Sequence, residues 1–179
     1  MTRVTARILG ALAVLTCACG QPGPYAEWKT FRHPDVGYTI RYLDPPWEVA
    51  EGEGTEIVLR VPNNAAAFGD IDSSMSPKYV LRITTPSGAP ASLAATEQTA
   101  AVRRGETIVE PASPFVTRSG DAGMQLVTQQ TDGEHLSRRW VWVSGDSRTV
   151  QLRVDSVPLA TEREVTVMLE SLDVDPEEP

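Results

Sequence analysis

The sequence predicts an α+β domain, in which a largely antiparallel sheet carries two main helices. From Glu27 to Pro158 apolar and polar residues mostly alternate, which is typical of strands with one buried face. Glycine, proline and aspartate interrupt the alternation where turns are expected. Residues 92–104 and 162–172 instead have helical spacing. An order of strands, helix, strands and helix favours helices packed on an antiparallel sheet.

The first half of the domain is expected to form four strands. The predicted strands are Trp28–Phe31, Tyr38–Tyr42, Glu56–Val61 and Tyr79–Thr84. The second strand should end before Pro45 and Pro46, because proline cannot donate a ladder hydrogen bond. Residues 63–77, which contain small residues and a short acidic piece, are interpreted as a long loop.

The second half is expected to begin with a helix and continue as a meander. The helix is predicted over Ser92–Arg104, with Ser92 as its N-cap and Gly105 just beyond its end. Short extended pieces are expected at 107–109 and 115–118. The predicted meander strands are Met124–Thr131, His135–Ser144 and Arg148–Asp155. The first two are joined through Asp-Gly, which favours a tight hairpin turn.

The closing helix is predicted over Glu162–Leu172. Its apolar residues fall at i, i+3, i+4 and i+7, which places them on one helix face: Val165, Met168, Leu169 and Leu172. Thr161 and Glu164 have the spacing of a capping box at the start of this helix.

Sorting the strand residues by parity predicts two different sheet faces. One face is apolar and should be covered by both helices. The other carries an arginine on each of four strands: Arg41, Arg60, Arg82 and Arg153. Two interpretations of these arginines are open. Their stems can lie on the sheet while their heads pair with neighbouring acids, or they form an open face that docks a partner.

Trp140 and Trp142 share one parity of the predicted strand 135–144 with Arg138. Tryptophans on a strand can belong to the core. If they point outward instead, they are candidate partner-binding residues, because tryptophan and arginine dominate interface hot spots.

The N-terminus has the pattern of a bacterial lipoprotein signal. Arg3 and Arg7 precede a short apolar run that ends at Leu15, which is too short to span a bilayer as a helix. Cys19 lies between Ala18 and Gly20 and is favoured over Cys17 as the acylated residue. Residues 1–18 are therefore predicted to be a signal peptide and 19–26 a lipidated cysteine with its spacer.

Residues 27–175 are predicted to form one domain, and residues 176–179 an acidic tail. Solvated chain is expected from Asp173 onward.

Charge excludes some classes of function. Removal of residues 1–18 leaves 14 basic and 24 acidic side chains, a net charge of −10. This balance argues against nucleic-acid binding, which needs a basic surface, and against membrane binding of the polybasic type.

Catalytic and cofactor motifs are missing from the sequence. It contains no Gly-x-Ser-x-Gly elbow, phosphate-binding glycine loop, His-Glu-x-x-His or Cys-x-x-Cys motif. His33 and His135 have no nucleophile nearby in sequence. Asp70 and Asp72 fall short of a calcium-binding loop. No enzyme activity, metal or cofactor is therefore expected.

One stretch resembles a known family. Residues 31–42, read Phe-Arg-His-Pro-Asp-Val-Gly-Tyr-Thr-Ile-Arg-Tyr, are followed by Pro45-Pro46-Trp47. This is similar to the start of PsbP-like and DcrB-like domains, which share the Mog-type fold of an antiparallel sheet with helices on its faces. Leu43-Asp44 departs from that pattern. The resemblance implies a non-enzymatic accessory, assembly or binding role.

The sequence therefore predicts a lipoprotein of the cell envelope that is anchored through acylated Cys19 and binds an envelope protein. The expected location is the outer membrane, facing the periplasm, with the inner membrane or the cell surface as alternatives. Alternative functions are binding of a small ligand under the loop 63–77, or hydrolysis involving His135.

Overall fold

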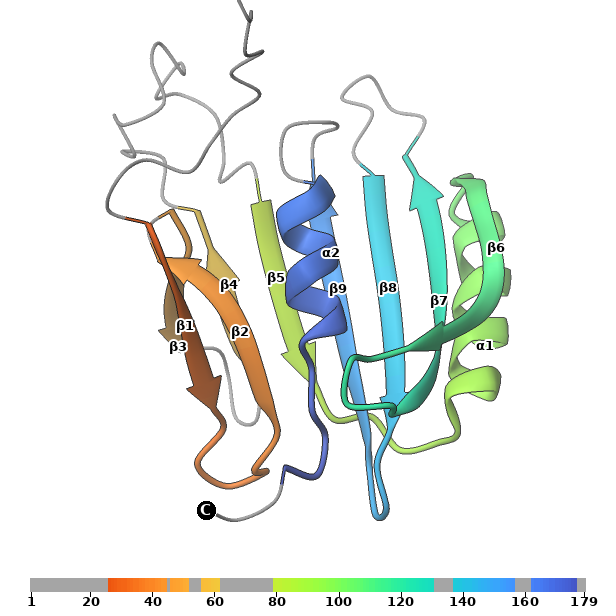
Figure 1. The fold of residues 1–179 in the computed structure, drawn as a ribbon. Coiled ribbons are helices and arrows are strands. Elements are labelled where there is room, and N and C mark those ends of the chain that lie inside the picture. The colour runs from red at the N-terminus through yellow and green to blue at the C-terminus, as the bar shows by residue number, and fades with distance from the viewer. Residues whose placement is uncertain are drawn as a thin grey trace, which may run out of the picture.

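In the computed structural model, the described residues are 26–44, 46–51, 56–61, 79–130, 137–156 and 162–176. They form nine strands and two helices (Figure 1). The elements, in chain order, are β1 (Glu27–Arg32), β2 (Thr39–Asp44), β3 (Glu48–Glu51), β4 (Ile57–Arg60), β5 (Tyr79–Thr84), α1 (Pro90–Arg103), β6 (Thr107–Val116), β7 (Ala122–Gln129), β8 (Ser137–Ser144), β9 (Thr149–Ser156) and α2 (Glu162–Glu170).

Seven strands form one antiparallel sheet in the order β3-β4-β5-β9-β8-β7-β6, and β1 and β2 form a separate hairpin. The predicted α+β class and the meander β7-β8-β9 are confirmed. The short strand β3 was not predicted, because its four residues follow two prolines. Several predictions concern residues outside the described ranges: the signal segment with Cys17 and Cys19, the loop 63–77 with Asp70 and Asp72, the Asp132-Gly133 turn, His135 and Thr161.

Helix α2 and the β1–β2 hairpin cover the front face of the sheet, toward the viewer in Figure 1, and the buried side chains on this face are apolar. Its buried cluster joins inward side chains of the sheet to those of α2 and the hairpin; they include Ile40, Trp47, Leu59, Leu81, Ile83, Leu152, Met168 and Leu169. At roughly 1.5–3 kcal/mol for each fully buried large apolar side chain, this cluster is the main stabilising core.

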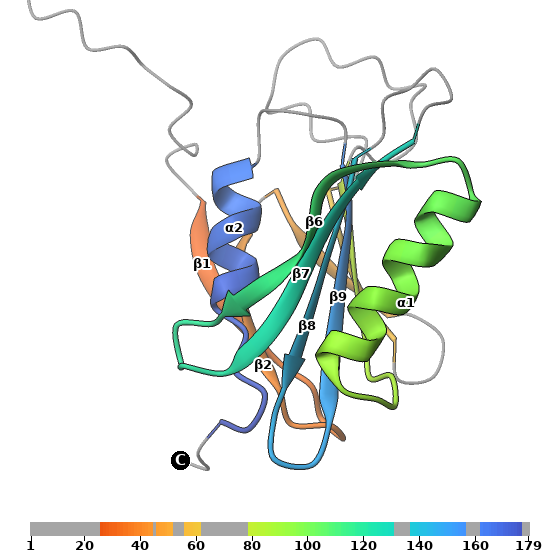
Figure 2. The same cartoon turned by 90° about the vertical axis from the view of Figure 1, so that its right-hand side faces the viewer.

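On the back face α1 covers β6, β7 and β8, so the prediction that both helices share the apolar face is wrong. Figure 2 shows α1 and α2 on opposite sides of the sheet. Under α1 lies a second buried cluster of Ala94, Leu126, Trp140 and Trp142. The Trp140 and Trp142 rings are stacked with centroids 5.9 Å apart, and Trp142 Nε1 donates to Gln151 Oε1 at 2.7 Å. Alternating sequence identified two faces but could not assign each helix to one of them.

The start of α1 differs from the prediction, whereas its end agrees. Its N-cap is Ala89, which makes no side-chain capping hydrogen bond, and Pro90 occupies the first turn. Proline suits that position because its fixed φ is helical and its missing N–H has no partner there in any case. At the other end Gly105 has φ of 78°, and Glu106 N–H donates to the Ala101 carbonyl at 3.0 Å. This is a Schellman ending.

The two short pieces predicted after α1 are a single ten-residue strand, β6. Its pairing with β7 contains two register shifts, one between Ile108 and Glu110 and one between Glu110 and Ser113. Such irregularities accommodate Pro111 and Pro114 at the edge of the sheet, where proline is tolerated.

The residues after α2 pack as a strap across one end of the domain, so the prediction of solvated chain from Asp173 is wrong. Asp173 exchanges backbone hydrogen bonds of 2.9 and 3.0 Å with Thr39. Val174 is buried, and Asp175 accepts a hydrogen bond from the Asp146 N–H in the β8–β9 turn. A Cβ at Gly145 would crowd the side chains of Asp175 and Val174, so a larger residue there would force these side chains of the strap to shift.

Candidate functional site

Half of the back face is not covered by α1. The helix packs against β6, β7 and β8, which leaves the outward side chains of β3, β4, β5 and β9. We call this area the open half-face; within the described residues its charged members are Glu48, Arg60, Arg82, Arg153 and Asp155. Arg60 and Arg82 side chains are 51% and 40% exposed, so they are available to a partner.

The strand register sets the charges of the open half-face side by side. Glu48 lies opposite Arg60, and Arg82 lies opposite Arg153. Arg60 Nε donates to Glu48 Oε1 at 2.8 Å, and Arg82 Nη1 donates to Glu56 Oε1 at 3.0 Å. Ion pairs this exposed stabilise a fold by only about 0–1 kcal/mol. They do give the surface a fixed pattern of alternating charge.

A more buried network continues from Arg153 toward the end of α1. Arg153 and Arg138 both donate to the Asp155 carboxylate, at 3.2 and 3.0 Å. Arg138 and Arg104 then share the carboxylate of Glu106, whose side chain is only 3% exposed. Burial by itself would raise the pKa of Glu106, but the hydrogen bond from Arg104 and the charges of Arg138 and Arg104 outweigh it, so the pKa is held below its ordinary value.

The structure brings together three of the four arginines predicted to share a face. Arg60, Arg82 and Arg153 lie on the open half-face, but Arg41 lies on β2 in the hairpin, where its guanidinium carbon is 5.7 Å from the centroid of the Trp28 ring. Sequence parity missed this separation because it does not say which strands pair. It also missed the acids Glu48, Glu56 and Asp155, which come from adjacent strands or loops.

Trp140 and Trp142 are buried beneath α1 rather than exposed. They are 7% and 1% exposed, so the outward orientation considered for them is not found. Arg153 connects them to the open half-face, because its guanidinium carbon lies 5.4 Å from the centroid of the Trp140 ring. The tryptophan cluster therefore borders the arginine surface on the same face of the sheet.

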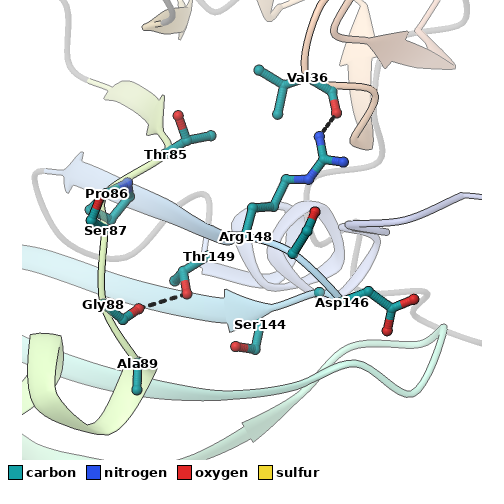
Figure 3. A pocket seen from close by; sticks show the side chains of 12 residues that line it. Val36, Thr85, Pro86, Ser87, Gly88, Ala89, Ser144, Asp146, Arg148 and Thr149 are labelled. Carbon is teal, nitrogen blue, oxygen red and sulfur yellow. Dashed lines mark hydrogen bonds between the residues drawn. The ribbon is translucent and has the colours of Figure 1, made fainter.

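A polar cleft of about 700 Å³ lies at one end of the sheet, between the β5–α1 connection, the β8–β9 turn and the hairpin turn. Figure 3 shows Arg148 reaching the Val36 carbonyl, while Thr149 Oγ1 donates to the Gly88 carbonyl at 2.8 Å. Ser144 and Asp146 also line it. The hydroxyl, carboxylate and guanidinium groups suit a small polar ligand.

His33, the described histidine, has a structural role. It is buried, and its Nδ1 accepts hydrogen bonds from the N–H groups of Asp35 and Val36 at 3.2 and 3.0 Å. The ring thereby closes the hairpin turn. Within the described residues no group of histidine, cysteine, aspartate and glutamate could hold a metal ion. No described helix is long and apolar enough to cross a membrane.

Comparison with known proteins identifies the fold. No protein-family model and no curated protein sequence matches the chain. The solution structure of cyanobacterial PsbP (CyanoP) from Synechocystis is similar with a TM-score of 0.56 and 12% identity, covering 88% of this chain and 97% of that chain. The Saccharomyces cerevisiae Ran-binding protein Mog1p has a TM-score of 0.56 and 8% identity, covering 84% and 96%. The PsbP/Mog-like fold is thus confirmed; identities this low do not extend to activity.

Proposed function

We propose that this protein is an envelope lipoprotein, anchored through acylated Cys19, whose domain binds another protein without catalysing a reaction. The observation that carries the binding role is the open half-face, a sheet surface with exposed arginines that the domain's own helices leave uncovered. The fold is also that of Mog1p, a Ran-binding protein, so it is one on which protein binding occurs.

The partner should present its own alternating charges. Arg60, Arg82 and Arg153 already pair with acids of this chain, so a partner must exchange these ion pairs for equivalent ones. Such surfaces contribute mainly to specificity and association rate. Placement of the domain at the outer membrane, facing the periplasm, is part of the proposal and is supported by the residues around Cys19.

Affinity capture from crosslinked membranes tests the binding role. Arg60, Arg82 and Arg153 would be replaced together by serine, and the captured proteins would be compared by quantitative mass spectrometry. Arg103→Ser is the matched control, because Arg103 is also exposed but lies on α1. We expect a specific partner to be lost only from the triple variant. Equal recovery from all three proteins would refute the open half-face as the binding surface.

Anchoring has its own test. Intact mass measurement of the purified protein should show cleavage before Cys19 and the added mass of acyl chains, and Cys19→Ser should move the protein out of the membrane fraction. A wild-type mass that shows no acyl addition would contradict the anchor without affecting the binding test.

Ligand binding in the polar cleft is a second candidate, favoured by its size and its mixed polar lining. Native mass spectrometry of protein purified without denaturation should then show a bound small molecule. Ser144→Leu, which narrows the cleft with an apolar side chain, should remove it. A wild-type mass equal to that of the chain alone would argue against this candidate.

A further inference from the structure

The β1–β2 hairpin carries the exposed tryptophan of this protein. Of the four tryptophans, Trp28 is 37% exposed, whereas Trp47, Trp140 and Trp142 are 0%, 7% and 1% exposed. Trp28 also lies outside the buried front cluster, because Phe31 is the β1 side chain that packs against that cluster.

Two arginines lie on the same side of the hairpin as Trp28. Alternation along β1 places Trp28 and Arg32 on one side, and the register pairs Thr30 with Arg41 on that side too. We call Trp28, Arg32 and Arg41 the outer patch. Among the described residues neither arginine has a carboxylate within ion-pair distance, unlike Arg60, Arg82 and Arg153. The outer patch is therefore a cationic and aromatic surface whose charges are not neutralised by described acids.

The outer patch is also the part of the domain closest in sequence to Cys19. Seven residues separate Cys19 from Glu27, the first residue of β1. Even fully extended, this spacer spans only about 25 Å. An acylated Cys19 would thus hold the hairpin near the membrane surface, while α1 lies on the far side of the sheet (Figure 2).

We propose that the outer patch rests on the phospholipid headgroups of the membrane that holds Cys19. Arg32 and Arg41 donate to lipid phosphates, for which guanidinium is well suited, and Trp28 lies at the interface, where tryptophan is favoured. The charge of −10 expected after removal of residues 1–18 does not prevent this contact, because charges beyond about 8 Å are largely screened at physiological ionic strength. This inference rests on the proposed acyl anchor, and it adds an orientation: the hairpin faces the bilayer and the open half-face points elsewhere.

Quenching of tryptophan fluorescence by brominated lipids tests the contact. Full-length acylated protein would be reconstituted into vesicles of phosphatidylethanolamine and phosphatidylglycerol with brominated acyl chains. The emission of Trp28 is the difference between the spectra of the wild type and of Trp28→Phe. We expect the brominated lipids to quench this emission strongly, because the other described tryptophans are buried. Each of Arg32→Ser and Arg41→Ser should lower the equilibrium constant for contact about fivefold. Arg103→Ser, on α1, should leave quenching unchanged.

The outcomes separate this inference from the anchor. Acylated protein that floats with the vesicles while Trp28 remains unquenched would overturn the membrane contact and leave the anchor standing. Trp28 that is shielded from aqueous iodide in native membranes, but is not quenched by brominated lipid, would assign the outer patch to a protein and also overturn the proposal. Protein that carries no acyl chain and does not float would instead contradict the anchor itself.

Discussion

The two faces of the seven-stranded sheet each carry a helix, but the helices leave them in different states. On the front, α2 and the β1–β2 hairpin together seal one apolar cluster. On the back, α1 covers only β6, β7 and β8, so the Trp140–Trp142 cluster borders directly on the open half-face. A residue's role therefore depends on two things: the face of the sheet to which its side chain points, and whether a helix covers its strand on that face. Five substitutions test this division.

The largest effect is expected from Trp142→Ala beneath α1. The substitution removes a ring that is stacked on Trp140 and breaks the hydrogen bond to Gln151. The free energy of unfolding should fall by about 3–5 kcal/mol. Urea unfolding followed by circular dichroism measures this loss. A loss below about 1 kcal/mol would mean that α1 does not form a second core.

Leu81 and Arg82 are neighbours on β5 that point to opposite faces. Leu81 is 1% exposed in the front cluster, so Leu81→Ala should lower the free energy of unfolding by about 2–5 kcal/mol. Arg82→Ala removes an exposed ion pair with Glu56 and should change it by about 0–1 kcal/mol. The same urea titration compares the pair. Equal losses of unfolding free energy from Leu81→Ala and Arg82→Ala would contradict the exposed, uncovered state of the open half-face.

Glu106→Gln tests the buried network at the border between the two regions. Loss of the charge weakens hydrogen bonds from Arg104 and Arg138 and should cost about 1–3 kcal/mol at neutral pH. Because the folded-state pKa of Glu106 is lowered, its contribution is present above the ordinary glutamate pKa and is lost as pH falls through the folded value. Thermal unfolding between pH 7 and pH 3 should therefore show the two proteins converging in acid. A constant difference would exclude this role.

The smallest effect is expected from Tyr38→Phe on the front. The hydroxyl is buried and has no hydrogen-bond partner among the described residues, so removing it should raise stability by about 1 kcal/mol or leave it unchanged. Burial also raises the pKa of Tyr38. The wild type should then lose stability relative to Tyr38→Phe as pH rises above about 10, the unfolded value. Denaturant titrations of both proteins at pH 7 and pH 10.5 measure the change in stability caused by the substitution and the change caused by pH.

Periodicity predicted much of the fold because it records burial directly. The alternation of Tyr79–Thr84 and Arg148–Asp155 corresponds to β5 and β9, and the spacing of Val165, Met168 and Leu169 places these three buried residues on one side of α2. The end of α1 just before Gly105 could also be predicted, because the positive φ at this position strongly favours glycine.

The sequence did not reveal which strands pair with one another. The pattern at Arg41 is the same as at Arg60 and Arg82, yet β2 pairs only with β1 as a strand and so removes Arg41 from the sheet. The weak amphipathic character of Ala-rich α1 gave no sign that its partner is the tryptophan cluster. The open half-face likewise depends on strand order, since Glu56 and Arg82 meet only after β4 and β5 pair.

The strap formed by Asp173, Val174 and Asp175 has a consequence for the order in which the domain folds. Its bridge to Thr39 joins the first hairpin of the domain to residues that follow the last helix, α2. The contacts around the hairpin are therefore complete only after α2 and the strap have reached it. Contacts this distant in sequence slow folding, because the intervening chain must first be ordered. Closure of the strap over β2 is thus expected to be a late step of folding.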